Sequence, residues 1–493
     1  MSYIGLDVGT SGCKAAIIST TGEILHSASD EYAFESPQAG YVELNPLTVW
    51  NSTKKVLTSI APFAADAKTI AVSSIGEAMV ILDDQDVPLY NGITYLDQRC
   101  VDTLPIIEQS ISAKKLHSIT GVSANQMFTL NKFIWFREHM PDVLTNARKF
   151  FLFGDYITYM LSGICAIDPG SASRTMFFDA RNHCWSKEIT DIFQIPIANF
   201  SKIMAPGSIL GRIKSSLAAE THLPKKINVI LGIHDQCAAT LGSGCMYPGE
   251  VMMGQGSTES INCVVHKDHL DDTLIENQIC FEPYIDNEHY IIITGNLTHG
   301  SSIAWFMRNF FNQTGKSDTP FNYDELYKNL PKDCGDVYFF PYLSKVQLLD
   351  AKNKALGGFL GIDVTVTREQ MYRALLEGLC CETRINIELF EKLHVPLHKL
   401  SASGGVSKAA DYMQMKADVL QRPIEILHTP EAGIMGLALI SAVAMGDFPT
   451  YSSAIECFIS YKKTYIPKYN YSKRYETYQA MSTLIKKFYN QSN

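Results

Sequence analysis

Asp7-Val-Gly-Thr-Ser-Gly-Cys-Lys14 joins two short apolar segments through a turn of glycine, threonine and serine. The segment before the turn is Tyr3-Ile-Gly-Leu-Asp7, and the one after it runs from Cys13 to Ser19. Glycine lets backbone N–H groups approach a phosphate closely, and the hydroxyls of Thr10 and Ser11 add donors. The pattern predicts an anion-binding turn between two strands, with a plain hairpin turn as the alternative.

A second loop of the same kind, Gly254-Gln-Gly-Ser-Thr-Glu-Ser260, lies between the apolar segments 251–253 and 260–265. Each loop stands near the start of one half of the chain, which makes a weak internal repeat. Two such loops suit a protein that binds a nucleotide's phosphates from both sides. We therefore expect two similar domains around a central cleft, over residues 1–245 and 246–493.

Helical and strand patterns alternate along the chain. The hairpin continues into a third strand near Ile24, an amphipathic helix is expected from Pro46 to Ala61, and a buried strand from Thr69 to Ser74. The tail from Lys462 ends in a helical pattern. This alternation predicts an α/β fold.

Asp235 follows the apolar strand Ile227–Leu231 and precedes an alanine-rich helical segment. A carboxylate in this position suits a general base that accepts the proton of a hydroxyl during phosphoryl transfer. The alternative is a helix N-cap, a common role for aspartate at the start of a helix. His234 beside it is expected near the substrate, and Asp7, at the end of its strand, is suited to hold Mg²⁺.

Gly404 and Gly405 stand in Ser403-Gly-Gly-Val-Ser407, ahead of a helical pattern that includes Met413 and Val419. Two glycines at a helix entrance allow a flat ring or a ribose to lie against the backbone. A simple turn is the alternative for the same pattern.

Composition argues against nucleic acid as a partner. The 493 residues carry a net charge of −9, from 42 basic and 51 acidic side chains. Basic residues cluster only in pairs such as Lys114-Lys115 and Lys225-Lys226, whereas a phosphate backbone is bound by a dense basic stripe.

Nothing in the sequence predicts a membrane segment or export. The most apolar small-residue stretch, Gly433 to Gly446, falls short of the roughly 20 residues that span a bilayer, so we expect a buried core helix there. The N-terminus shows no signal-peptide pattern. The twelve cysteines lack metal-binding spacings and are expected to be reduced, mostly buried thiols. These features favour a cytoplasmic location.

The chain resembles the FGGY family of carbohydrate kinases, which includes xylulokinases, gluconokinases and glycerol kinases. The resemblance covers nearly the whole length and rests on motifs in the family's order. They are Asp7–Lys14; Gly40–Pro46 before Trp50; Tyr95–Arg99; Met127–Trp135; Asp168–Ser173 to Asp179; Gly357–Ile362 through Gln370 to Glu377; and Gly404-Gly405 with Ala417–Pro423 and Glu431–Gly433.

The resemblance implies an actin-like ATPase fold of two ribonuclease H-like domains, binding ATP and Mg²⁺ and transferring phosphate in line to a sugar. The N-terminal domain would hold the substrate and the first phosphate loop, and the C-terminal domain the nucleotide; a homodimer is implied too. The matching positions give Asp235 as base and Asp7 as Mg²⁺ ligand. The cofactor-binding positions are Thr10, Ser11, Lys14, Gly256, Ser257 and Thr258 for the phosphates, with Gly404 and Gly405 for the adenosine.

Substrate choice is expected in the first domain, where the chain departs from the family. The segment Ser74–Met79, which contains Glu77 and Ala78, stands where the resembling xylulokinases and gluconokinases carry a Met-His pair. That pair is missing here, and only Glu77 matches the Arg-Glu of glycerol kinases. A carboxylate there suits a ketose or polyol better than an anionic gluconate. Asp97 and Arg99 are expected in the same pocket, with His234 and Asp235. The alternatives are a surface turn residue for Glu77, and for Asp97 and Arg99 a pair with each other.

Two further readings stay open. Within kinases, the alternative substrates are gluconate and glycerol. In another class, the chain is an actin-like ATPase that works as a nucleotide-driven binding module, which needs no base beside a substrate pocket. The loop Pro341–Lys345 also departs from the family, which usually continues with Gly-Glu-Arg.

Overall fold

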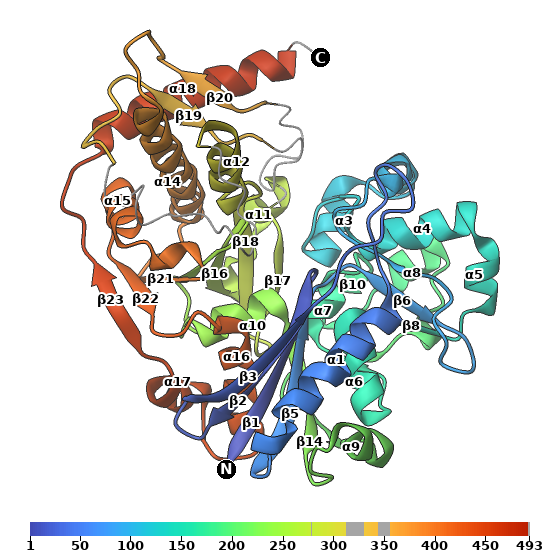
Figure 1. Cartoon of the computed structure of the whole chain (residues 1–493). Coiled ribbons are helices and arrows are strands. Elements are labelled where there is room, and N and C mark those ends of the chain that lie inside the picture. The colour runs from blue at the N-terminus through green and yellow to red at the C-terminus, as the bar shows by residue number, and fades with distance from the viewer. Residues whose placement is uncertain (278, 312–329, 344–354, 492–493) are drawn as a thin grey trace. The chain divides into compact units, whose positions relative to one another are not determined.

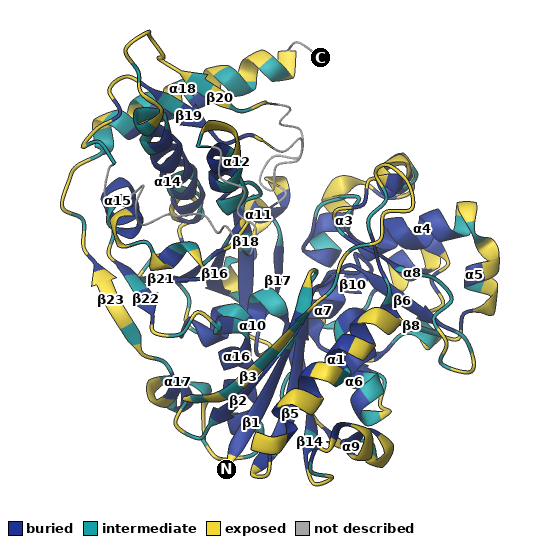
Figure 2. Ribbon diagram, in the orientation of Figure 1, coloured by how far each residue is buried: buried dark blue, intermediate teal, exposed yellow. Residues whose placement is uncertain are grey.

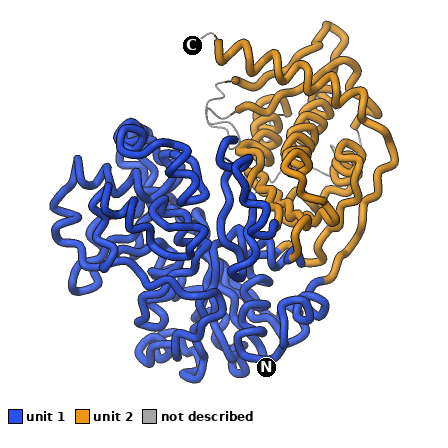
Figure 3. Tube along the Cα trace, turned by 180° about the vertical axis from the view of Figure 1, so that it is seen from behind, with its two compact units in different colours: residues 1–246, 265–292, 431–459 blue, residues 247–264, 293–430, 460–493 orange. Residues whose placement is uncertain are grey.

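The computed structural model describes residues 1–277, 279–311, 330–343 and 355–491. They form two compact units, shown in Figure 3. The first contains Met1–Met246, Val265–Ile292 and Glu431–Ile459; the second contains Tyr247–Val264, Ile293–Pro430 and Ser460–Asn493. The sequence-based limits, 1–245 and 246–493, stay a prediction. Ser344 and Lys345, in the loop that departs from the family, lie outside the described residues.

The first unit is built on a six-stranded sheet. Its strands lie in the order β13 (Ile209–Arg212), β14 (Asn228–His234), β5 (Ala67–Ser74), β1 (Ser2–Val8), β2 (Gly12–Ser19) and β3 (Ile24–Glu31). The meander β1-β2-β3 is antiparallel, and β5 and β14 run parallel to β1. The meander and the strands predicted near residues 69–74 and 227–231 are confirmed.

The two faces of this sheet have different partners. Ile4, Leu6 and Val8 belong to a core that also contains side chains of α1 (Pro46–Ile60) and α6 (Phe153–Ser162). Successive strand residues point to opposite faces, and Gly5 lies against Ile434 of α16 (Ala432–Ala444). Figure 1 shows α1 and α6 beside β5, and Figure 2 shows α1 buried on one side only. Asp7 therefore points to the α16 face.

Two glycines bring α16 against α10 (Asp235–Gly242). A Cβ added to Gly436 would lie 2.0 Å from the carbonyl oxygen of Ala238, and one added to Gly242 would lie 1.8 Å from that of Ala432. The backbones thus touch where no side chain fits. α16 is mostly buried, which confirms the core helix predicted from the apolar stretch.

The first unit also has a second core, formed by side chains such as Met79, Phe133 and Phe150, and further elements besides the six-stranded sheet, α1, α6, α10 and α16. These elements are β4 (Glu43–Leu44), η1 (Ala61–Phe63), β6 (Met79–Leu82), β7 (Gly92–Ile93), η2 (Arg99–Thr103), α2 (Leu104–Ser110), α3 (Ala113–Thr120), α4 (Thr129–His139), α5 (Pro141–Asn146), β8 (Lys149–Leu152), β9 (Ala166–Ile167), α7 (Pro169–Ser173), β10 (Phe178–Asp179), β11 (Cys184–Trp185), α8 (Lys187–Phe193), η3 (Ile197–Asn199), β12 (Lys202–Ile203), α9 (Ser215–Thr221), η4 (Lys267–His269), α11 (Asp272–Glu276) and α17 (Tyr451–Phe458).

A second sheet repeats the strand order of the first. It runs β17 (Phe281–Pro283), β18 (His289–Asn296), β16 (Glu259–His266), β15 (Glu250–Gln255), β21 (Lys399–Ser403), β22 (Ile424–Leu427) and β23 (Tyr461–Tyr465). In the first sheet β5 pairs with β1, and β14 pairs with β5. In the second sheet β21 pairs with β15, and β22 with β21, and both of these pairs are parallel. The weak repeat predicted from the two loops is a repeat of topology.

The remaining elements of the second unit are α12 (Gly300–Phe310), β19 (Tyr338–Phe340), β20 (Gly358–Leu360), α14 (Arg368–Lys392), η5 (Val406–Lys408), α15 (Ala410–Leu420) and α18 (Ser472–Gln491). α14 is the longest and begins with a capping box between Thr367 and Gln370. The helices expected after Gly405 and at the tail are confirmed as α15 and α18.

Two predictions concern the chain as a whole. Within the described residues, every helix is too short or too polar to cross a membrane. None of the twelve cysteines, all of them within the described residues, forms a disulfide, and eight are buried.

The contact between α10 and α16 leads to a stability prediction. Gly436→Ala places a methyl group where the Ala238 carbonyl lies, so we expect it to lower the free energy of unfolding by about 3 kcal/mol. Denaturant unfolding measures this. Gly358→Ala is the control, because a Cβ there meets no atom within 4 Å. Equal unfolding midpoints for the two variants would contradict the account.

Candidate active site

Asp7 lies one residue before the end of β1 and is half-buried. Its Oδ1 accepts a hydrogen bond of 2.8 Å from the hydroxyl of Ser73 on β5. Burial, and after it the negative charge of Asp235, raises the pKa of Asp7 to about 6. Two carboxylates close enough to repel each other at a strand end make a place where a cation is favoured.

The predicted phosphate loop is a tight hairpin turn between β1 and β2. The Gly9 N–H donates to the Gly12 carbonyl at 2.9 Å. Thr10 is half-buried and Ser11 is exposed. Lys14 Nζ lies 2.5 Å from Glu431 Oε1, beside the start of α16. An anion-binding turn and a plain hairpin turn would both have this geometry, so the role of the loop in phosphate binding stays a prediction.

Asp235 is the first residue of α10, and His234, the last residue of β14, occupies the cap position. The N-cap alternative for Asp235 is therefore wrong. Its side chain is 28% exposed, while that of His234 is 4% exposed. Burial raises the pKa of Asp235, and the positive charge of His234 opposes that rise. The carboxylate is thus held in a largely dry site with one side open.

Glu77 is buried, so the surface-turn alternative is wrong. Its backbone has a φ of 58°, which is uncommon for a residue with a side chain. The hydroxyl of Thr129 and the Nζ of Lys132 each donate to its carbonyl at 2.9 Å and hold this conformation. Ala78 is buried and completes the tight turn, because its N–H donates to the Gly76 carbonyl at 2.6 Å.

Arg174, which sequence reasoning missed, binds the carboxylate of Glu77. Its Nε and Nη2 donate to Glu77 Oε1 at 2.7 and 2.5 Å, and its Nη1 lies 3.4 Å from Glu282 Oε2. A Cβ at Gly76 would lie 2.7 Å from Arg174 Cγ and 3.3 Å from His234 Nε2, so this turn needs glycine. Arg174 directly follows the family segment ending at Ser173, which is the signal that could have identified it.

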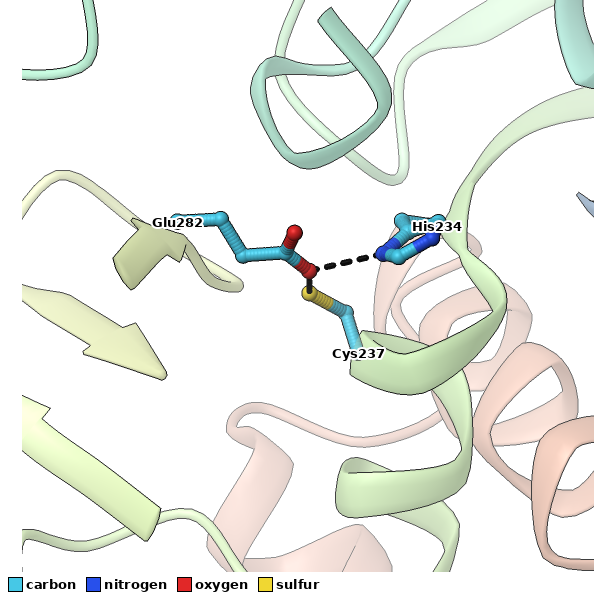
Figure 4. Close-up of side chains that lie close together, drawn as sticks. All are labelled: His234, Cys237 and Glu282. Carbon is cyan, nitrogen blue, oxygen red and sulfur yellow. Dashed lines mark hydrogen bonds and ion pairs between the residues drawn. The ribbon is translucent and has the colours of Figure 1, made fainter. Parts of the chain in front are cut away.

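Glu282 joins Arg174 to His234. Its Oε1 lies 2.7 Å from His234 Nδ1 and accepts from Cys237 Sγ at 3.1 Å, as Figure 4 shows. His234 Nε2 lies 3.2 Å from Asp235 Oδ1. Burial alone would lower the pKa of His234, but the carboxylates of Glu282 and Asp235 raise it to about 9. No spacing in the sequence links Glu282 to this site; β17 brings it there.

The ligand atoms of His234, Cys237 and Glu282 lie within 4.8 Å of one another, which is close enough for a metal ion. Each of them already has a hydrogen-bond partner in the group, and Arg174 faces the other oxygen of Glu282. We therefore do not identify these three residues as metal ligands.

Tyr95 is a further neighbour of the site. Burial raises the pKa of Tyr95, the negative charges of Glu77 and Asp235 raise it further, and the nearby hydroxyl of Thr10 opposes the rise. Tyr95 thus lies within reach of both carboxylates and of the phosphate loop. It opens the predicted Tyr95–Arg99 motif.

Asp97 and Arg99 bind each other, which was the alternative for this pair. Arg99 Nε and Nη2 donate to the two oxygens of Asp97 at 2.9 and 2.7 Å, and Nη2 also donates to Glu43 Oε1 at 2.8 Å. Asp97 Oδ2 further accepts from the Val42 N–H at 2.6 Å. These contacts fix the loop that carries Tyr95, and a substrate role for the pair stays a prediction.

In the second unit, Gly256, Ser257 and Thr258 form the exposed turn between β15 and β16. The start of α12 lies against it, because the Gly300 N–H donates to the Gly256 carbonyl at 3.1 Å. The N–H groups of Gly300 and Ser301 thus bind the carbonyls of Gly256 and Ser257 and hold the turn against the helix.

Gly404 lies beside the same turn. Its φ is 99°, and a Cβ on it would lie 2.3 Å from the Gln255 carbonyl, so only glycine fits. A Cβ on Gly405 would meet no atom within 4 Å. The structure thus brings the two predicted nucleotide segments of this unit together, with open space beside Gly405.

Two relatives and one solved structure resemble the chain over most of its length. The xylulose kinase of Staphylococcus epidermidis is 24% identical over 98% of this chain and 96% of its own. The glycerol kinase of Leifsonia xyli is 27% identical over 90% of this chain and 89% of its own. The crystal structure of xylulose kinase from Rhodospirillum rubrum superposes with a TM-score of 0.88 at 23% identity, covering 99% of this chain and 100% of the other.

The structural likeness confirms the expected actin-like ATPase fold. Two family models cover most of the sequence: the N-terminal domain of the FGGY family of carbohydrate kinases matches residues 2–242, and its C-terminal domain matches residues 258–445. The chain belongs to the FGGY family of carbohydrate kinases, enzymes that transfer a phosphate to a hydroxyl of a sugar.

Proposed function

We propose that the enzyme phosphorylates a neutral ketose or polyol with ATP, with D-xylulose as the first candidate. The observation that best supports this proposal is a pair of carboxylates in different surroundings. Asp235 is partly exposed, whereas Glu77 is buried and bound to Arg174. Tyr95 lies near both. One carboxylate is suited to accept a proton and the other to bind hydroxyl groups.

Asp235 acts as the general base in this proposal. A substrate hydroxyl donates its proton to the carboxylate while its oxygen attacks the γ-phosphorus of ATP, and ADP leaves in line. His234 holds Oδ1, so Oδ2 is the oxygen that accepts the proton. Burial keeps water from all but the open side of the carboxylate, and a substrate that covers this side favours transfer to the sugar.

Glu77 selects a neutral substrate. Arg174 binds Glu77 Oε1 and leaves Oε2 to accept hydrogen bonds from hydroxyl groups. The negative charges of Glu77 and Asp235 near Tyr95 would repel the carboxylate of gluconate. Glycerol is also neutral, so the charge argument allows it as well as a ketose. The two relatives compared above are named for these two substrates, xylulose and glycerol.

Asp7 is proposed to hold Mg²⁺, directly or through water. The donor set fits, because a carboxylate oxygen is a ligand that Mg²⁺ prefers and the mutual repulsion of Asp7 and Asp235 is relieved by a cation. When bound, the metal neutralises charge on the phosphates of ATP. Thr10, Ser11 and Lys14 then supply hydroxyl and ammonium donors to the same phosphates.

The second unit is proposed to bind the rest of the nucleotide. Gly256, Ser257 and Thr258 supply phosphate contacts at the exposed turn, and Gly404 and Gly405 offer a backbone surface for the adenosine. The cytoplasmic location and the homodimer also stay predictions.

A substrate screen tests the proposal directly. We expect ATP-dependent ADP release with D-xylulose or another ketose or polyol, and little with gluconate, measured by a coupled assay over pentuloses, hexuloses, pentitols, glycerol and gluconate. Activity on gluconate alone would contradict the role given to Glu77. Sugar-independent ATP hydrolysis with no phosphorylated product would support the binding-module alternative.

For Asp235→Asn we expect a fall in kcat of about 10²–10⁴-fold, because the substrate proton loses its acceptor. ATP binding, measured by calorimetry, should persist. Asp191→Asn is a control in the same unit, since that carboxylate is exposed and pairs with the exposed Lys187. A kcat within twofold of the wild type would remove Asp235 from the base role.

For Glu77→Gln we expect KM for the sugar to rise about 10–100-fold with little change in KM for ATP, because charged hydrogen bonds to substrate hydroxyls become neutral ones. Glu43→Gln is the matched control, since Glu43 is another buried glutamate paired with an arginine. It should reduce thermal stability and leave the sugar KM unchanged. A larger effect on sugar KM from Glu43→Gln than from Glu77→Gln would move the substrate site to Asp97 and Arg99.

A further inference from the structure

Five buried or nearly buried side chains of the first unit form one line of alternating charge. In order they are Glu77, Arg174, Glu282, His234 and Asp235, and every neighbouring pair lies between 2.5 and 3.4 Å apart. They come from four separate parts of the chain: the turn after β5, the residue after α7, strand β17, and the junction of β14 with α10. The established reaction assigns no role to Arg174 or Glu282.

The position of His234 in this line fixes its protonation. Its Nδ1 faces Glu282 Oε1 at 2.7 Å and its Nε2 faces Asp235 Oδ1 at 3.2 Å. A neutral imidazole carries one N–H, so one ring nitrogen would point a lone pair at a carboxylate. The imidazolium presents an N–H to each carboxylate: Nδ1 forms a hydrogen bond with Glu282 Oε1, and Nε2 forms an ion pair with Asp235 Oδ1.

We propose that Glu282 is a positioning residue that holds His234 as the imidazolium which orients Asp235, and that Arg174 joins this arrangement to Glu77. The inference rests on the proposed function, in which Asp235 is the base. It adds a residue, Glu282, that acts on the base through His234 and touches neither substrate nor phosphate.

Glu282 is the necessary anion because of what surrounds His234. Burial opposes the charge on the ring, and the groups that face it are Glu282, Asp235, Arg174, Asp168 and Cys237. Asp168 Oδ1 accepts from the His234 backbone N–H at 3.4 Å and not from the ring. Without Glu282, the ring would keep the negative charges of Asp235 and Asp168 nearby, would lose the hydrogen bond at Nδ1, and would still face the positive charge of Arg174.

The oriented imidazolium does two things for Asp235. Its Nε2 forms an ion pair with Oδ1 at 3.2 Å, which leaves Oδ2 to accept the substrate proton. Its positive charge favours the ionised form of the carboxylate, against burial and the nearby carboxylates. A base that must be ionised to work is thereby kept ready.

Arg174 extends the same arrangement to the substrate carboxylate. Its Nη1 faces Glu282 Oε2 while Nε and Nη2 face Glu77 Oε1. One glutamate thus sets the orientation of both the base and the proposed hydroxyl acceptor. Loss of Glu282 is expected to affect kcat through His234 and KM through Arg174.

Glu282→Gln tests the inference, because it keeps the shape of the side chain and removes its charge. Cys237→Ala is the matched control: Cys237 donates to the same Oε1 at 3.1 Å but carries no charge. We compare the two with the wild type by thermal unfolding, by kcat and KM against pH, and by NMR titration of ¹³C-labelled histidine. His234→Gln assigns the His234 signal among the 13 histidines.

In the wild type we expect the His234 ring to titrate near its pKa of about 9. The imidazolium exists below that pH and is lost above it, so kcat should hold up to about pH 9 on the alkaline side. In Glu282→Gln the ring should titrate about 1–3 pH units lower, and the alkaline fall in kcat should move with it. At neutral pH the kcat of Glu282→Gln should be at least threefold below that of the wild type. In Cys237→Ala the midpoints of the His234 titration and of the alkaline fall in kcat should stay within 0.3 of a pH unit of the wild type, or about twofold in proton affinity.

An unchanged His234 titration in folded Glu282→Gln would overturn the inference, whatever the activity. So would stoichiometric zinc in the purified protein that Cys237→Ala removes, because His234 would then be bound to a metal. The NMR titration does not depend on enzymatic turnover. If no sugar is phosphorylated but the pKa of His234 still falls in Glu282→Gln, the proposed function is wrong and the effect of Glu282 on the protonation of His234 is supported.

Discussion

A buried line of alternating charge, from Glu77 through Arg174, Glu282 and His234 to Asp235, constrains the first unit of this enzyme. Charges taken out of water are costly, and breaking a buried pair by removing one partner typically costs about 3–5 kcal/mol. The cost of burying these charges is offset because each of the three interior residues has an opposite charge on both sides. Only its last carboxylate is open on one side, and that is the group to which we assign the chemistry.

The fold places the end of this line beside Asp7 through backbone contact. Gly436 and Gly242 let α16 lie directly on α10, and α16 also covers the face of β1 from which Asp7 points. The starts of both helices therefore lie near the carboxyl ends of β1 and β14. Burial, and after it the negative charge of Asp235, raises the pKa of Asp7, and the repulsion between the two carboxylates is the electrostatic reason to expect a cation there.

Much of the fold could be predicted from the sequence because it depends on local patterns. The glycine-rich turns with an apolar strand on each side predicted the strand meanders. The apolar stretch that is too short to span a membrane predicted α16. Asp235 was identified by its place between an apolar strand and a helical segment, and Glu77 by its place where the family carries its substrate motif. Arg174 and Glu282 were not, because the contact that defines them joins residues 108 positions apart. A single sequence also could not show that Asp97 and Arg99 bind each other, since the same two residues suit a sugar pocket equally well.

The central claim is that the last carboxylate of this line accepts the proton of the sugar hydroxyl. The most direct measurement is the pH dependence of phosphoryl transfer in a single turnover, in the wild type and in Asp235→Asn. Since burial raises the pKa of Asp235, the wild-type rate should fall tenfold per pH unit below a midpoint higher than the ordinary aspartate value of about 4. The residual rate of the variant should lack that dependence. The same acid limb in both proteins would contradict the account.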